Sequence, residues 1–172
     1  MIEKSTIEKV LEAFFESPSE RFHLRELSRR LGLSMPTIIT ATDTLSKESL
    51  ILKTKGKVVT EVQANRENAR FTQHKRINNM ERIYGSGLLE HLIAKYNNPK
   101  LIILFGSYSK GEDVERSDID IAIITAKRLH LDLDVFEKKL GKKISIHELE
   151  LGQTSNEFKA NLANGIVLEG SW

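Results

Sequence analysis

Segment 101–124 constrains the fold of this chain more than any other part. It opens with five consecutive apolar residues, 101–105, followed by Gly106 and Ser107. A short apolar run bounded by turn-forming residues predicts a buried strand that ends in a tight turn. Gly106 would let a ligand approach the backbone, Ser107 offers a hydroxyl, and a helix beginning here would point free N–H groups at an anion. We therefore expect an anion-binding turn at the end of this strand.

A second predicted strand, 118–125, carries two carboxylates. Ten residues separate Ser107 from Asp118. Strand alternation places Asp118 and Asp120 on one face and the isoleucines between and after them on the other. Two carboxylates on an otherwise apolar strand are costly unless a charge neutralises them, and a divalent cation does so. The pattern indicates a metal-dependent nucleoside triphosphate site. The alternative is a Gly-Ser turn followed by a strand with a solvated acidic face.

The order of an apolar strand, Gly-Ser, a spacer and Asp-x-Asp resembles the nucleotidyltransferase superfamily that includes DNA polymerase beta, specifically its small archaeal and bacterial members. Gly106, Ser107, Asp118 and Asp120 match that pattern. The resemblance implies transfer of a nucleoside monophosphate from a triphosphate with two Mg²⁺ ions. Asp118 and Asp120 would hold the metals, and Gly106 and Ser107 would hold phosphates. Lys110 would add positive charge there, or is simply solvated.

The family's third carboxylate is missing. It normally comes from a later strand, which the sequence predicts over 143–149. Ser145 stands at that position. His147 shares the face of Ser145, whereas Glu148 points the other way unless a bulge re-aims it. His147 is either a ligand or base, or a satisfied polar group at a sheet edge. With Ser145 in place of the third carboxylate, we still expect nucleotide and metal binding. Whether the domain catalyses transfer is left open.

Three short helices and a hairpin precede residue 65. Apolar residues at helical spacing predict helices over 2–16, 23–31 and 35–47, and two strands, 50–53 and 58–62, flank a turn at 55–57. Gly32 ends the second helix and Ser34 caps the third. This pattern is similar to a winged helix-turn-helix. The resemblance implies a DNA-binding domain over 1–65, with 35–47 as the recognition helix and 53–60 as the wing.

Small polar and basic residues are the candidate contacts to double-stranded DNA. They are Thr37, Thr40, Thr44, Lys47, Lys53, Lys55 and Lys57. The threonines would face base edges and the lysines would meet phosphates. However, Ile39 and Asp43 share the outward half of the helix, which offers no Arg or Asn for bidentate base contacts. The alternative is a winged helix used for dimerisation or for docking on a partner.

Residues 66–98 are predicted to form linker helices, and 99–172 a small α/β domain. Phe71, Ile77, Met80, Ile83 and Tyr84 mark one linker helix, which would pack against its twin in a homodimer. Its basic residues, Arg70, Lys75, Arg76 and Arg82, form a solvated face or contact nucleic acid. In 99–172, strands at 101–105, 118–125 and 143–149 alternate with helices at 131–140 and 154–164, and a last apolar patch covers 166–168. We therefore expect a mixed sheet with flanking helices, in an α/β (α+β) protein overall.

Composition sets the remaining expectations. The chain has no cysteine, which rules out disulfides and thiolate metal sites and suits a reducing cytoplasm. We expect neither a membrane span nor a signal peptide. Residues 1–98 carry 16 Lys and Arg against 12 Asp and Glu, and 99–172 carry 10 against 12. The first part is therefore mildly basic, as nucleic acid binding permits.

Two functions follow from these patterns. The first is a nucleotidyltransferase fused to a DNA-binding module. Some members of the family act as antitoxins that transfer AMP to a partner protein, so a protein acceptor is one expectation. The second is a DNA-binding transcriptional regulator whose nucleotidyltransferase domain is degenerate or only binds nucleotide. The missing carboxylate favours the second function, and the intact Gly-Ser and Asp-x-Asp favour the first.

Overall fold

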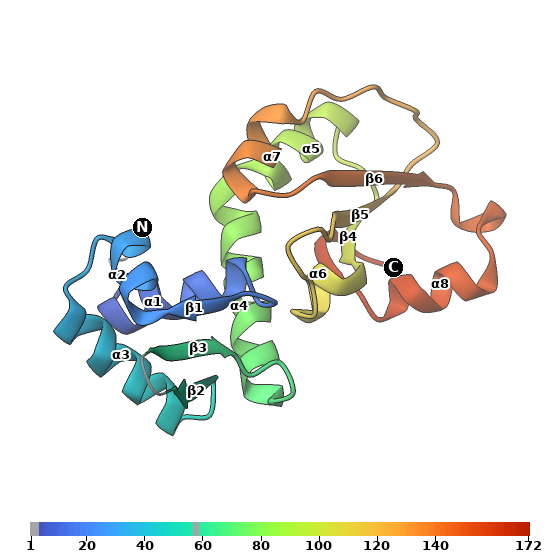
Figure 1. Ribbon diagram of the computed structural model, residues 1–172. Coiled ribbons are helices and arrows are strands. Elements are labelled where there is room, and N and C mark those ends of the chain that lie inside the picture. Colours follow the sequence, from blue (N-terminus) through green and yellow to red (C-terminus); the bar gives the residue numbers. More distant parts are fainter. Residues whose placement is uncertain (1–3, 57–58) are drawn as a thin grey trace. The chain divides into compact units, whose positions relative to one another are not determined.

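The chain folds into two compact units. A computed structural model describes residues 4–56 and 59–172 (Figure 1). The units are Met1–His74 and Lys75–Trp172. Helix α4 (Ala69–Ser86) begins in the first unit and continues in the second. The residues predicted as linker helices, 66–98, are therefore divided between the two units.

The first unit combines three helices with a small antiparallel sheet. Its elements are α1 (Thr6–Glu16), β1 (Arg21–His23), α2 (Leu24–Leu31), α3 (Met35–Lys47), β2 (Ile51–Lys55) and β3 (Thr60–Ala64). The sheet order is β1-β3-β2. The Ser5 and Ser34 hydroxyls accept backbone hydrogen bonds that cap α1 and α3. The three predicted helices are confirmed, although the first begins at Thr6, and residues 2 and 3 of that prediction lie outside the described residues. Lys57 and Val58, part of the predicted wing, lie outside the described residues.

Strand β1 was not predicted. It has only three residues, and it exists because β3 supplies the hydrogen-bonding partners, with Phe22 opposite Val62. Phe22 is buried against Phe14, with ring centroids 5.5 Å apart. Phe15 packs likewise on Phe71 at the start of α4, at 5.2 Å. These aromatic contacts lie within the larger apolar core of the first unit.

The second unit is built on a four-stranded mixed sheet. Its elements after α4 are α5 (Leu88–Tyr96), β4 (Leu101–Phe105), α6 (Gly106–Lys110), β5 (Ile119–Ile124), α7 (Asp134–Leu140), β6 (Ile144–Leu149), the 3₁₀ helix η1 (Leu151–Gln153), α8 (Asn156–Ala163) and β7 (Ile166–Gly170). The strand order is β6-β5-β4-β7, with β5 and β6 parallel and the other pairs antiparallel. The predicted α/β fold class and mixed sheet are confirmed, and the last apolar patch is an edge strand.

Both faces of this sheet are covered. Helices α5 and α7 pack on the face that carries Ile119 and Ile121, and α8 covers the face that carries Phe105 and Ala122. Figure 1 shows α5 and α7 on one side of β5 and β6 and α8 on the other. Asp120 alternates with Ile119 and Ile121, so its carboxylate lies on the α8 side. No helix in the described ranges is long and apolar enough to cross a membrane.

Two sequence predictions in the second unit are wrong. The predicted linker helix forms as α4, and Ile77 and Tyr84, expected to pack against a second copy, are exposed in the single chain, Ile77 at 66 %. Lys75, predicted to be solvated or to meet nucleic acid, is instead 2 % exposed, because a buried carboxylate pairs with it. Helix α7 begins at Asp134 rather than at 131, after a turn in which the Asp132 carboxylate accepts the Asp134 N–H.

Candidate active site

The Gly-Ser turn and Asp120 lie against each other. Strand β4 is buried along its whole length, and its last residue, Phe105, pairs with Asp120 of β5. Gly106 follows with a φ of +73°, and a Cβ atom added there would lie 2.6 Å from Oδ2 of Asp120. Only glycine combines that backbone angle with that close approach. The glycine of the motif is therefore required by the carboxylate that faces it.

Helix α6 shapes the turn that follows. Ser109 Oγ donates to the Gly106 carbonyl at 2.8 Å, and the Glu112 N–H donates to the Ser107 carbonyl at 3.0 Å. Ser107 is half-buried beside this turn, and Lys110 is exposed at the end of α6. The Ser107 hydroxyl and the Lys110 ammonium thus lie on the same short segment as Gly106.

Strand β6 faces the two carboxylates with a hydroxyl and an imidazole. Ser145 pairs with Asp120 in the parallel register. Ser145 Oγ lies 3.4 Å from Oδ2 of Asp118, and His147 Nε2 lies 3.3 Å from Oδ1 of Asp120. Asp118 is exposed immediately before β5, and Asp120 is half-buried within it. Four polar side chains from two neighbouring strands therefore meet on one face of the sheet.

Glu148 is engaged on the opposite face. Its carboxylate accepts the Tyr96 hydroxyl at 2.6 Å and the Leu129 N–H at 2.7 Å. Burial, and then the carboxylate of Glu148, raise the pKa of Tyr96. The β5–β6 register runs without interruption from Ile119 to Ile124, so no bulge turns Glu148 toward the aspartates. The third carboxylate is thus not supplied by this residue.

His147 also belongs to an aromatic cluster. Its ring lies 5.1 Å from Phe105 and 6.0 Å from Phe158 of α8, and the two phenylalanines lie 5.5 Å apart. These contacts orient the imidazole so that Nε2 faces Asp120. The histidine is therefore both packed and placed at the carboxylates.

The donor set suits Mg²⁺ only in part. Among the described residues, no group of three or more His, Cys, Asp and Glu side chains is arranged to hold a metal ion. Mg²⁺ does not need such a cage, because it commonly binds through one or two carboxylates and completes its shell with phosphate oxygens and water. Asp118 and Asp120 would supply those carboxylates. Two hard oxygen ligands next to a turn with free polar groups fit a metal that arrives with a nucleotide.

The comparison with protein families concerns the domain that contains these residues. Residues 88–170 match the family "Polymerase beta, Nucleotidyltransferase". No curated protein matched the chain. The match covers β4 to β7, including the turn at Gly106 and both aspartates, and it supports a nucleotidyltransferase-type domain with a nucleotide substrate. Residues 1–87 lie outside it.

The nucleotidyltransferase-like domain contains a buried ionic cluster that sequence reasoning missed. Asp113, between α6 and β5, pairs with Lys75 of α4 and with Lys142 just before β6. One signal was available: Lys75 follows Phe71 by four residues, which places it on the buried face of α4. The identity of its partner, 38 positions further along the chain, had no local signal.

In the first unit, the predicted DNA-contacting threonines make local hydrogen bonds. Thr37 Oγ1 and Ser34 Oγ lie 2.7 Å apart, and Thr44 Oγ1 donates to the Thr40 carbonyl at 3.0 Å. Thr40 is exposed, and Thr37 and Thr44 are half-buried. The Thr40 side chain therefore offers the most accessible hydroxyl of the three.

The predicted DNA-contacting lysines differ in their environments. Lys53 Nζ lies 2.9 Å from Asp43 Oδ1 and donates to Thr42 Oγ1 at 3.1 Å, with its side chain 10 % exposed. The hydrogen bond from Lys53 lowers the pKa of Asp43. Lys47 and Lys55 are exposed, and Lys57 lies outside the described residues. Lys53 is therefore held by α3, whereas Lys47 and Lys55 can reach a ligand.

Proposed function

We propose that the nucleotidyltransferase-like domain binds a nucleoside triphosphate with Mg²⁺ and transfers its nucleoside monophosphate to an acceptor. The observation that supports the proposal is the close approach of the Asp120 carboxylate to Gly106, where an added Cβ would lie 2.6 Å from Oδ2. Gly106, Ser107 and Lys110 would bind phosphates. Asp118 and Asp120 would hold the metal.

The residues of the chain would bind and orient the reactants. The Gly106 backbone leaves room for a phosphate, and the Ser107 hydroxyl would donate a hydrogen bond to it. When bound, Mg²⁺ supplies neutralising charge and activates the attacking oxygen. In the transfer, the acceptor oxygen forms a bond to the α-phosphorus, the bond to pyrophosphate breaks, and the acceptor loses its proton. His147, beside Asp120, is the neighbouring side chain able to accept that proton.

One observation favours the alternative of a transcriptional regulator. A hydroxyl, Ser145 Oγ, stands beside Asp118 where the family places a carboxylate. In this case the domain binds a nucleotide as an effector, or is degenerate, and does not turn it over.

Titration of the full chain with labelled ATP, CTP, GTP and UTP separates these functions. Binding and transfer are scored separately, with and without Mg²⁺. The transferase proposal expects Mg²⁺-dependent binding and label transferred to protein or another acceptor, with self-modification as the simplest assay. Binding without transfer supports the effector role. Affinity that is indifferent to Mg²⁺ overturns the site assignment.

Ser145→Asp is expected to increase metal dependence and transfer activity. The new carboxylate would lie beside Asp118, so without metal the like charges raise a carboxylate pKa and lower the melting temperature. Saturating Mg²⁺ should remove that penalty, so the rise in melting temperature on adding metal should exceed that of the wild type.

Ser145→Asn is the matched control for this prediction. Asparagine has nearly the same size as aspartate but no charge. Neither the lower melting temperature without metal nor the larger rise on adding Mg²⁺ should therefore appear. A Ser145→Asp protein whose melting temperature responds to Mg²⁺ as the wild type does would place β6 outside the metal site.

We further propose that the first unit is a winged helix-turn-helix that binds double-stranded DNA. Three helices and a three-stranded antiparallel sheet support this, with α3 as the recognition helix and the β2–β3 hairpin as the wing. Such a module would let an antitoxin-like transferase regulate its own transcription, as a homodimer on a two-fold symmetric site. Dimerisation or partner docking by this unit is the alternative.

Combined replacement of Lys47 and Lys55 by alanine is expected to weaken DNA binding on all sequences alike. Both side chains are exposed, and loss of two phosphate contacts should lower the slope of log affinity against log salt by about 2. Lys9→Ala, an exposed change in α1, should leave affinity unchanged. Lys53→Ala should have a smaller effect than either exposed lysine, because Asp43 already holds its ammonium. Unchanged mobility shifts in the double variant would favour partner docking.

A further inference from the structure

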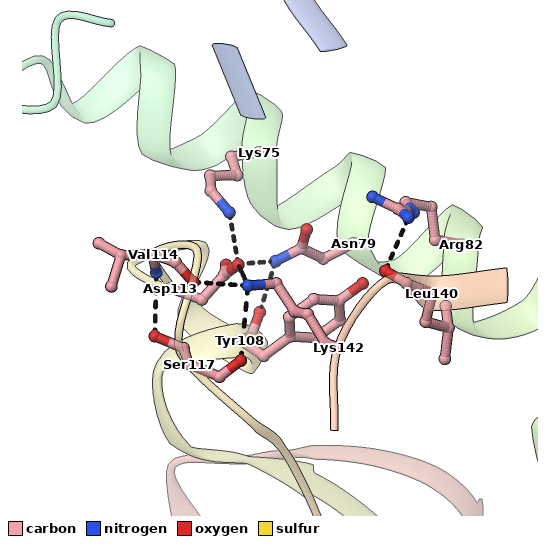
Figure 2. Close-up of polar contacts among 9 residues, drawn as sticks. All are labelled: Lys75, Asn79, Arg82, Tyr108, Asp113, Val114, Ser117, Leu140 and Lys142. Atoms are coloured by element: carbon pink, nitrogen blue, oxygen red, sulfur yellow. Dashed lines mark hydrogen bonds and ion pairs between the residues drawn. The ribbon is translucent and has the colours of Figure 1, made fainter. Parts of the chain in front are cut away.

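A fully buried carboxylate, Asp113, lies in the connection between α6 and β5 of the second unit. Asp113 Oδ2 lies 2.6 Å from Lys75 Nζ and 3.2 Å from Lys142 Nζ, and the Asp113 side chain is 0 % exposed. Asn79 Nδ2 donates to Asp113 Oδ1 at 2.8 Å. Figure 2 shows Lys75 and Asn79 reaching Asp113 from α4, with Lys142 reaching it from the chain that leads into β6. Three segments that are distant in sequence thus converge on one carboxylate.

Such a cluster is an expensive way to stabilise a fold. Burial lowers the pKa of Lys75, and the Asp113 carboxylate only partly opposes that effect. Apolar side chains of similar volume often serve as well as a buried ion pair, or better. What charged groups add is fixed geometry, since every donor and acceptor must meet a particular partner.

The partners of this cluster lie on segments next to the candidate site. Asn79 Nδ2 also donates to the Tyr108 carbonyl at 2.9 Å, in the helix that opens at Gly106 and Ser107. The side-chain amide of Asn79 therefore links Asp113 to the turn that begins at Gly106 and Ser107, called here the phosphate turn. The turn cannot shift relative to α4 without losing one of these two bonds.

Lys142 holds the segment that leads to the metal carboxylates. Its ammonium donates to the Val114 carbonyl at 2.5 Å and lies 3.5 Å from the Ser117 carbonyl, directly before Asp118. Ser117 Oγ in turn accepts the Val114 N–H at 2.9 Å. Lys142 also precedes β6, which brings Ser145 to Asp118. The Lys142 ammonium therefore links residues 114–117, which lead to Asp118, to the start of β6, the strand that faces Asp118.

We infer that Asp113, with Lys75, Asn79 and Lys142, positions the phosphate turn, the Asp118–Asp120 strand and β6 relative to one another. These are positioning residues, since no atom of the cluster lies at the proposed reacting groups. The inference rests on the proposed function for its catalytic consequence. Its structural consequence, restraint of residues 106–119, stands independently of any activity.

Lys142→Met tests the inference with the least disturbance. It removes the Lys142 contacts to Asp113, Val114 and Ser117 but keeps the Lys75–Asp113 pair. Amide hydrogen exchange of residues 113–119 in the full chain should quicken at least tenfold, while exchange in β4 is unchanged. If the protein transfers nucleotide, kcat should fall at least tenfold with KM for the triphosphate within about threefold. Lys142→Arg, which keeps a donor, should recover part of both.

Lys138→Met is the matched control, because Lys138 is an exposed lysine four residues earlier. It should change neither exchange nor transfer. The triple variant Lys75→Met, Asp113→Leu, Lys142→Met separates positioning from stability. It should keep a melting temperature near that of the wild type and still show faster exchange over 106–119.

The outcomes separate the inference from the proposed function. Exchange over 106–119 that stays at the wild-type rate in both Lys142→Met and the triple variant overturns the inference. Faster exchange with undiminished transfer confirms the restraint and overturns its catalytic consequence. A wild-type protein that binds no triphosphate overturns the proposed function, and the exchange measurement still decides whether the cluster restrains the site.

Discussion

Replacement of Asp118 and Asp120 by asparagine is expected to abolish Mg²⁺-dependent triphosphate binding. Asparagine keeps the shape of each side chain and removes the charge that would hold the metal. Mutation of a residue that hydrogen-bonds to a metal ligand typically lowers the metal affinity about 10–100-fold. Loss of both carboxylates that would bind the metal directly should therefore lower it at least about 100-fold. Isothermal titration with each triphosphate, with and without Mg²⁺, measures the effect.

The same variant should fold normally. Removal of two like charges from one face relieves repulsion when metal is absent, so the metal-free melting temperature should hold or rise. Glu90→Gln with Glu169→Gln is the control, because it removes two exposed carboxylates elsewhere in the second unit. Retention of Mg²⁺-dependent binding in the Asp118 and Asp120 variant would show that the metal binds at other residues.

Asp113→Ala is expected to destabilise the second unit by about 3–5 kcal/mol, the usual result of removing one partner from a buried ion pair. It would leave the ammonium of Lys75, 2 % exposed, without its carboxylate, and Asn79 without one acceptor. Urea unfolding, followed through amide signals of residues 75–172, measures the loss without assuming that both units unfold together.

Asp134→Ala is the comparison for this stability measurement. Asp134 is exposed in the first turn of α7, where an acidic residue contributes about 0.3–1 kcal/mol. A loss from Asp113→Ala no larger than this would mean that water reaches the two lysines and that the cluster is not buried in solution.

The sequence alone determined the elements whose signals are local. Ser5 and Ser34 cap α1 and α3, and Gly32 ends α2 in the left-handed conformation, so these helices were predicted within a few residues. Apolar runs and strand alternation likewise predicted β4 and β5. Each of these signals acts over one turn of helix or one strand, so no knowledge of the fold is needed to recognise it.

The motif that suggested the site is also local. Gly106, Ser107, Asp118 and Asp120 lie on one strand–turn–strand unit, and the antiparallel pairing of β4 with β5 brings Asp120 to Gly106. Strands that follow one another in the chain usually lie side by side, so that pairing is the expected one. The family resemblance put Ser145 at the site, and alternation along β6 put His147 on the same face; the structure brings both beside the aspartates.

Only the tertiary structure decided which charged groups are buried. Lys75 was predicted to be solvated or to contact nucleic acid, but it is buried, because Asp113 offers it a carboxylate. A buried ammonium without such a partner would be very costly. The ammonium of Lys53 is likewise held by a carboxylate, that of Asp43 in α3. Such partners lie 10 to 38 positions apart in the chain, so their meeting depends on the packing of whole elements.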